Sequence, residues 1–114
     1  MQRIYRLTRN SSFGYIFKKG EKYRNNLIML YKLNAGSIKV GISVSKKVGN
    51  SVVRSKVKRR IKEAFRLIIP ELNGKYNFVV VAAEAAAQAT YLELDTALKQ
   101  MLTRAGVLKD NKDK

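Results

Sequence analysis

Hydrophobic residues recur at helical spacing in the middle of the chain, from Val53 to Ile68, while the polar positions between them are almost all basic. At 100° per residue one stripe of this segment is apolar, and it comprises Val53, Val57, Ile61, Ala64, Phe65 and Ile68. Arg59, Lys62 and Arg66 lie directly opposite that stripe. The pattern predicts an amphipathic helix that the fold holds by its apolar side, leaving a wide cationic face for phosphates.

A shorter helical pattern lies near the start of the chain. Phe13, Ile16 and Phe17 recur at i, i+3 and i+4, with an Asn-Ser pair at 10–11 as the N-cap and Gly20 as the terminator. Aromatic residues next to cations either pack into a core or stack unpaired bases. The pattern alone leaves both roles open for Phe13 and Phe17.

The last helical pattern begins with a capping box, Thr90-x-x-Glu93, and ends at Gly106. Its apolar stripe comprises Leu94, Leu98, Met101, Leu102 and Ala105. Charges of both signs occupy the exposed side, so we assign this helix to stability rather than to RNA binding. Residues 109–114 are expected to form a frayed tail.

Four segments have strand patterns. Glu21–Arg24 is a weak candidate for an edge strand, and Leu27–Leu33 is apolar on both faces apart from Lys32, which is typical of a central strand. Ile38–Lys47 alternates between apolar and polar residues, and Tyr76–Ala83 is a continuous apolar run. The sequence therefore predicts an edge strand, a central strand, a strand with one face toward the core, and a strand buried on both faces.

The expected order of elements is helix, three strands, helix, strand, helix. This order predicts an α+β sandwich in a single domain over residues 1–108, with helices packed on a mixed, mostly antiparallel four-stranded sheet. The strand, basic helix and strand in the middle can contain one parallel pairing.

The polar face of the segment Ile38–Lys47 and the loop that follows it are candidate ligand surfaces. This face is small and cationic, and it is either a solvent face or the floor of a groove. In the loop, Lys46 and Lys47 precede Gly49, and either of the residues at 50–51 can cap the basic helix. A helix N-terminus beside two lysines favours an anion.

Composition and charge narrow the function. The net charge is +16, and residues 1–62 carry all of it, with 17 Lys or Arg against one acid, whereas residues 63–114 hold seven of each sign. This one-sided charge indicates a polyanion surface, and nucleic acid fits it better than a membrane because no strongly hydrophobic face accompanies it. Cysteine is absent, which fits a cytoplasmic protein, and neither a membrane span nor a signal-peptide core is found.

Bond chemistry has little support in the residues themselves. Histidine and cysteine are absent, and the eight carboxylates form no convincing cluster for metal binding. No phosphate-loop motif occurs. The chain is therefore expected to bind a polyanion without cleaving it.

The residues also favour one kind of nucleic acid. The seven cations from Arg54 to Arg66 suit contacts to the phosphate backbone of a nucleic acid better than readout of its bases. Aromatic residues in the same half of the chain favour RNA over duplex DNA.

The stretch from Val40 to Arg66, VGISVSKKVGNSVVRSKVKRRIKEAFR, closely resembles the signature region of the bacterial ribonuclease P protein component. The resemblance continues in SSFGYIFKKG, IMLYKL, YNFVVVAA and the last helix, and it covers residues 1–108. It implies the protein subunit of a ribozyme that removes 5′ leaders from precursor tRNA. In that family the RNA subunit and its Mg²⁺ ions cleave the phosphodiester, while the protein aids substrate binding and metal affinity. The resemblance also implies an unusual left-handed crossover through the basic helix.

The resemblance assigns two groups of residues. Those that it places against the RNA subunit are Lys46, Lys47, Arg54, Ser55, Lys56, Lys58, Arg59, Arg60 and Lys62. Those that it places in the cleft for the leader are Phe13, Phe17 and Tyr31. The family's Arg-Asn-Arg motif falls on Arg54, Ser55 and Lys56. The first arginine is kept. Lys56 replaces the second arginine and lacks its bidentate guanidinium, and Ser55 replaces the asparagine and lacks its side-chain amide.

The expected partners are ribonuclease P RNA and precursor tRNA, with no indication of protein oligomers. Two alternatives share the same composition and charge. One is a structural RNA-binding protein of the ribosomal or assembly-factor type with no role in turnover, and the other, less well supported, is a duplex-DNA binder. Dependence on a single-stranded 5′ extension separates the first alternative from a precursor-tRNA endonuclease subunit.

Overall fold

The computed structural model describes residues 6–7 and 10–108. Its elements are α1 (Asn10–Lys19), β1 (Glu21–Arg24), β2 (Ile28–Asn34), β3 (Lys39–Ser43), α2 (Ser51–Ile68), the 3₁₀ helix η2 (Ile69–Glu71), β4 (Tyr76–Ala82), the 3₁₀ helix η3 (Glu84–Gln88) and α3 (Tyr91–Arg104). The predicted order of three α-helices and four strands is confirmed. The expected tail at residues 109–114 lies outside the described residues.

The four strands form one mixed sheet in the order β1-β2-β4-β3. The β1/β2 and β2/β4 pairs are antiparallel, whereas β3 and β4 are parallel neighbours joined through α2. The expected mixed, mostly antiparallel sheet with one parallel pair is therefore confirmed. The left-handed sense of the crossover remains a prediction from the resemblance.

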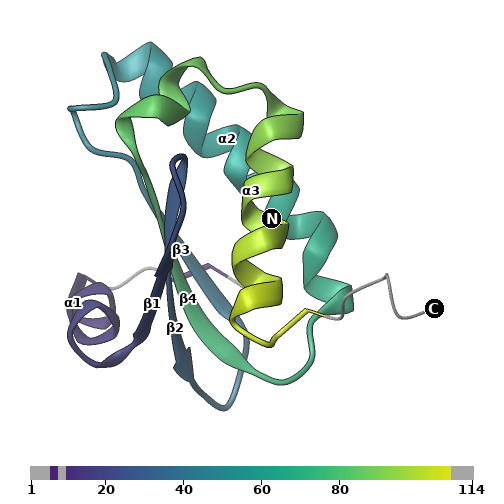
Figure 1. The fold of residues 1–114 in the computed structure, drawn as a ribbon. Coiled ribbons are helices and arrows are strands. Elements are labelled where there is room, and N and C mark those ends of the chain that lie inside the picture. Colours follow the sequence, from purple (N-terminus) through teal and green to yellow (C-terminus); the bar gives the residue numbers. More distant parts are fainter. Residues whose placement is uncertain (1–5, 8–9, 109–114) are drawn as a thin grey trace.

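Helices cover the two faces of the sheet unequally (Figure 1). Helices α2 and α3 lie side by side on one face, and their apolar stripes pack with the inward residues of the strands into the main core, where the rings of Phe65 and Phe78 lie 5.3 Å apart. Helix α1 lies on the other face, against β2 and β4. Its Ile16 is only 1% exposed, as a core residue should be.

Strand β3 is shorter than its alternating pattern predicts. The prediction of a strand over Ile38–Lys47 was wrong at both ends, since β3 covers Lys39–Ser43 and a turn follows at 46–48. The ladder ends because β4, the neighbour of β3 in the sheet, itself ends at Ala82, one residue beyond the partner of Ser43. Lys47 consequently belongs to the loop before α2.

The helix caps agree with the sequence. Asn50 caps α2 by accepting a hydrogen bond from the Val53 backbone N–H at 3.0 Å, and Thr90 and Glu93 form the reciprocal capping box of α3. Gly106 follows α3 with φ +78, as a terminating glycine should. Gly20 follows α1 for a different reason, because a Cβ there would lie 2.7 Å from the Ile16 carbonyl oxygen.

Lys32 departs from the apolar character of β2 and is nevertheless buried, with 8% of its surface exposed. Its ammonium donates to the Ala105 carbonyl oxygen at 3.1 Å and lies 3.1 Å from a carboxylate oxygen of Glu21. It also lies 5.0 Å from the centre of the Tyr76 ring. These contacts satisfy the charge and tie the end of α3 to the sheet. Within the described residues, no helix is long and apolar enough to cross a membrane.

Candidate nucleic-acid interface

The three aromatic residues of the predicted leader cleft lie together. Phe13 and Phe17 are one turn apart on α1, with ring centres 6.5 Å apart, and Phe17 meets the Tyr31 ring of β2 edge to face at 4.9 Å. Phe17 is 42% exposed, and the other two rings are half-buried. Ile16, next to Phe17 on α1, is buried instead. Phe13, Phe17 and Tyr31, called the aromatic cluster below, thus form a ring surface that remains accessible to a ligand.

Phe13 is seated by a glycine of β3. A Cβ built on Gly41 would lie 2.4 and 2.7 Å from two atoms of the Phe13 ring, so only glycine allows the ring to rest there. Gly41 itself is buried, while its neighbours on the same face, Lys39 and Ser43, are half-buried. The polar face of β3 is therefore not a free solvent face, because α1 covers its centre.

Beyond the aromatic cluster, α1 leaves part of the sheet uncovered. The register places Met29, Val81 and Ser43 in one row across β2, β4 and β3, next to the row that contains Tyr31. All three are half-buried, and the Tyr31 hydroxyl donates to the Met29 sulfur at 3.2 Å. Figure 1 shows α1 beside one half of the strands and the connection from β3 to α2 beyond their other ends. An extended single strand of nucleic acid lying on this row would therefore reach from the aromatic cluster toward the start of α2.

Most cations of the basic helix are exposed, as its periodicity predicts, but Lys62 is half-buried although the periodicity places it directly opposite the apolar stripe. Lys46, Lys47, Ser55, Lys56, Lys58 and Arg59 are exposed, and Arg54, Arg60 and Lys62 are half-buried. The first turn of α2 contains no acidic residue, so the positive end of the helix dipole adds to the lysines of the preceding loop. Arg54 is held in place, since its Nε donates to the Gly49 carbonyl oxygen at 3.2 Å.

Arg60 has a structural partner that the sequence pattern did not reveal. Its Nη1 donates to the carbonyl oxygen of Ala89 at 2.7 Å, just before α3 begins. The acceptor is a backbone oxygen far along the chain, and backbone acceptors leave no signal in a sequence. Part of the Arg60 guanidinium is therefore used to join α2 to the start of α3.

The single acid of α2 is paired within the helix. The Arg66 guanidinium donates two hydrogen bonds to Glu63, one of them from Nε at 3.1 Å. This contact lowers the pKa of Glu63 and raises that of Arg66. Arg66 is consequently the cation of α2 whose charge is most nearly compensated, and the uncompensated cations lie N-terminal to it.

A pocket of about 210 Å³ lies at the outer edge of β3, the edge not paired with β4, between α1 and α2. Its lining comprises Arg6, Leu7, Phe13, Val40, Gly41, Ile42, Lys58 and Lys62. The chain at Arg6 pairs with β3 through one bridge, in which the Leu7 backbone N–H donates to the Val40 carbonyl oxygen at 2.9 Å. Sequence reasoning missed Arg6, because only this pairing brings it to the basic helix.

The described residues do not provide a metal site. Nowhere in residues 6–7 and 10–108 do three or more Asp, Glu, His or Cys side chains gather in a way that would hold a metal ion. The cations of α2 also disfavour a divalent ion at this surface. The Mg²⁺ ions implied by the resemblance are thus not fitted by the protein's own side chains.

Comparisons with known proteins agree with one another. The family model described as Ribonuclease P matches residues 1–106. A ribonuclease P protein component from Clostridium novyi is 41% identical over 111 residues, which cover 94% of this chain and 98% of the relative. The solved RNase P protein of Staphylococcus aureus is 34% identical, with a TM-score of 0.85 over 92% of this chain and 98% of that chain.

A more distant structure gives the same result. The RNase P protein of Thermotoga maritima is 25% identical, with a TM-score of 0.79 over 87% of this chain and 96% of that chain. Family model, relatives and structures all match nearly the whole chain. The chain therefore belongs to the bacterial ribonuclease P protein family, and it is the protein component of a tRNA-processing endoribonuclease that acts at the 5′ end of precursor tRNA together with ribonuclease P RNA.

Proposed function

We propose that the protein binds the single-stranded 5′ leader of precursor tRNA on the aromatic cluster and the adjoining sheet surface. In the same complex the loop at 46–47 and the exposed side of α2 hold the ribonuclease P RNA. The observation that carries this proposal is the accessible aromatic cluster on α1 and β2. The cluster lies on one face of the sheet, and the basic helix begins beyond the far end of that face (Figure 1). Stacking on rings suits unpaired bases, and uncompensated cations suit phosphates.

Several residues are proposed to contact the RNA subunit. Lys46, Lys47, Lys56 and Arg59 are exposed, and Arg54 is oriented by its hydrogen bond to Gly49. Ser55 is exposed between two cations and offers a hydroxyl rather than an amide to RNA. Arg60 keeps only those guanidinium N–H groups that do not bond Ala89. The resemblance also assigns Lys58 and Lys62 to this group.

A higher affinity for Mg²⁺ would arise indirectly. The protein's own carboxylates do not gather into a metal site in the described part of the chain. By holding the leader and the RNA subunit together, the protein would fix the phosphates that bind the metal ions. Protein binding and Mg²⁺ binding are then thermodynamically linked, so each increases the affinity of the other.

Reconstitution at low Mg²⁺ tests the proposal. The protein alone should cleave nothing, and added to the RNA subunit it should increase cleavage of precursor tRNA that carries a leader. A substrate without a leader should gain less. An equal gain for both substrates would indicate a structural RNA-binding protein, and no gain over the RNA alone would contradict the proposal entirely.

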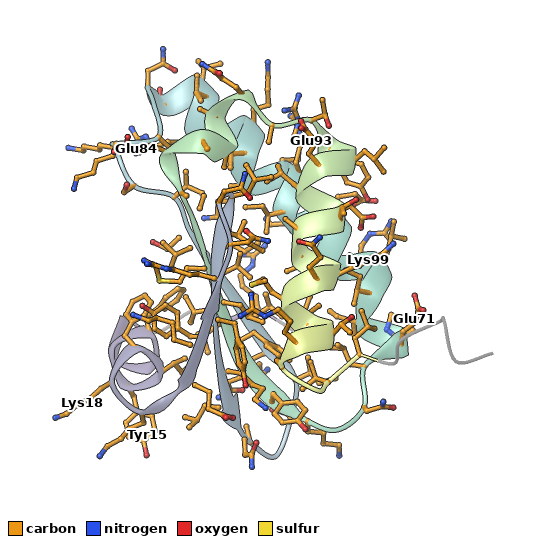
Figure 2. The ribbon with its side chains drawn as sticks, in the orientation of Figure 1. Tyr15, Lys18, Glu71, Glu84, Glu93 and Lys99 are labelled. Atoms are coloured by element: carbon orange, nitrogen blue, oxygen red, sulfur yellow. The ribbon has the colours of Figure 1, made fainter. Side chains whose placement is uncertain are left out.

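The variant Phe17→Ala localises the leader contact. It should weaken binding of leader-bearing substrate by roughly fivefold to 100-fold, the range of one base-stacking contact of about 1–3 kcal/mol. Tyr15→Ala is the matched control, since Tyr15 is another aromatic residue of α1, 58% exposed and projecting from the lower side of the helix in Figure 2. Loss of thermal stability with unchanged leader preference would instead identify Phe17 as a core residue.

A further inference from the structure

Three positive residues line the pocket at the outer edge of β3. Arg6 approaches from the segment paired with β3, while Lys58 and Lys62 are one turn apart on α2. None of the eight lining residues is acidic. Like charges one turn apart destabilise a helix, and a third cation lining the same pocket adds to the repulsion. An anion bound in the pocket would remove this cost.

The pocket also shares Phe13 with the aromatic cluster. Phe13 belongs to both, because its ring rests on Gly41 and forms one wall of the pocket while it neighbours Phe17 on α1. A volume of about 210 Å³ corresponds to roughly seven water molecules. This space suffices for a phosphate group and part of the sugar attached to it.

We propose that this pocket binds one phosphodiester group of the 5′ leader, at the point where the leader leaves the aromatic cluster at Phe13. The inference rests on the proposed function, since it extends the path of the same strand. Lys58 and Lys62 then contact the substrate rather than the RNA subunit, and Arg6 joins them as a third phosphate ligand. The leader runs from Tyr31 past Phe17 and Phe13 to the edge of the sheet.

The chemistry of the lining supports a phosphodiester rather than a base as the buried group. Lysine and arginine side chains offer only donors, and each charge-assisted contact to a phosphate oxygen is stronger than a neutral hydrogen bond. The base attached to that phosphate would lie against Phe13. A phosphate of the RNA subunit has the same chemistry, so the experiment must separate the two sources.

The two phosphate sources can be separated with substrates whose leaders are lengthened step by step. Their binding to the reconstituted holoenzyme is measured. The wild-type affinity should rise when the leader becomes long enough to reach the pocket, and Lys58→Ala with Lys62→Ala should abolish that rise, weakening binding by about tenfold or more. Lys75→Ala is the matched control, because it removes an exposed lysine outside the pocket. If the double variant instead loses affinity for the RNA subunit while the leader-dependent rise remains, the two lysines contact the RNA subunit and the proposal is wrong.

A methylphosphonate at single leader positions identifies the phosphate. At one position the neutral linkage should weaken binding to the wild-type protein by a similar factor, and it should cause no further loss in the double variant. Two results would overturn the proposal. One is that the losses of the neutral linkage and of the double variant add at every leader position, and the other is that the double variant loses as much affinity for a leaderless substrate. Measuring Phe17→Ala in the same assay separates the pocket assignment from the proposed function. If only Phe17→Ala affects leader dependence, the pocket assignment is wrong and the proposed function stands.

Discussion

Helices α2 and α3 lie on the same face of the sheet and pack in the same way, yet their outer sides differ completely. Each buries five residues in the common core, among them Phe65 of α2 and Leu98 of α3. Helix α2 carries seven Lys or Arg residues and one acid, whereas α3 carries two of each sign. Burial thus explains why both helices form, and the outer side of α2 differs by a surplus of positive charge that a polyanion would neutralise.

The two helix starts show the same contrast. Thr90 and Glu93 close the start of α3 with a capping box whose carboxylate also compensates the helix dipole. Asn50 caps α2, but no acid follows in its first turn. On α3 the Lys99 ammonium is paired with Asp95 at 3.0 Å, as on a helix whose surface serves stability alone. The start of α2 is left positive, which favours RNA binding.

The largest expected effect lies in the shared core. Phe65→Ala removes a fully buried ring that packs on Phe78, and it should lower the free energy of unfolding by about 3–5 kcal/mol. Leu98→Ala should cost about 2–5 kcal/mol for the same reason. Urea titration, monitored by circular dichroism, measures both losses of stability. A negligible loss in only one of the two variants would show that the helices do not share their core as described.

The second effect separates the outer sides. Replacing both Lys56 and Arg59 of α2 by Ala should weaken binding to the RNA subunit. It should also reduce the slope of log affinity against log salt by about 2, roughly one unit for each phosphate that the variant no longer neutralises. The control is Lys99→Ala with Arg104→Ala on α3, which should leave the slope unchanged. Filter binding across a salt series gives both slopes. Equal reductions in the two double variants would contradict the division between the helices.

The third effect is smaller and concerns the caps. Asn50→Ala and Thr90→Ala should each cost about 1 kcal/mol of stability, because each leaves a backbone N–H without its side-chain acceptor. Only Asn50→Ala should also weaken RNA binding, since it loosens the helix start beside Lys47. Thermal unfolding measures the first quantity and RNA affinity the second. RNA binding weakened by Thr90→Ala would show that α3 also takes part.

The smallest effect concerns Glu63. The hydrogen bond from Arg66 lowers the pKa of this carboxyl in the folded state, so its stabilising contribution is present above the pKa of the unfolded state. That contribution is lost as the pH falls through the lowered pKa. Glu63→Gln should therefore flatten the pH dependence of stability below about pH 4.5 and change little at neutral pH. A steeper acid dependence in the variant would contradict this assignment.

Helix and strand positions could be predicted from the sequence because burial follows a local period. The stripe of α2, the capping box at Thr90 and the central strand β2 all follow from spacing over a few residues. The end of β3 could not be predicted, since it depends on where β4, its neighbour in the sheet, ends. The alternating pattern continues to Lys47 without a strand to pair with.

The parts of the site that the sequence did not reveal all depend on contacts between distant segments. Gly41 seats Phe13 across the interface between β3 and α1, and Arg6 lines the same pocket as Lys62 because its segment pairs with β3. The bond from Arg60 ends on a backbone oxygen. Residue types and spacing predict surfaces on single elements, whereas a pocket between elements depends on the tertiary fold.

The position of β3 at the edge of the sheet has a consequence for the order of folding. Strands β1 and β2 are joined by a short turn and can pair early, whereas β3 pairs with β4 only after the intervening chain, including α2, has been brought into place. In the native state, β3 backbone amides should therefore exchange with solvent through partial opening, at a lower cost than those of β2. Because Phe13 rests on Gly41, each such opening would transiently disrupt the aromatic cluster that we propose for the leader, while the rest of the core remains folded.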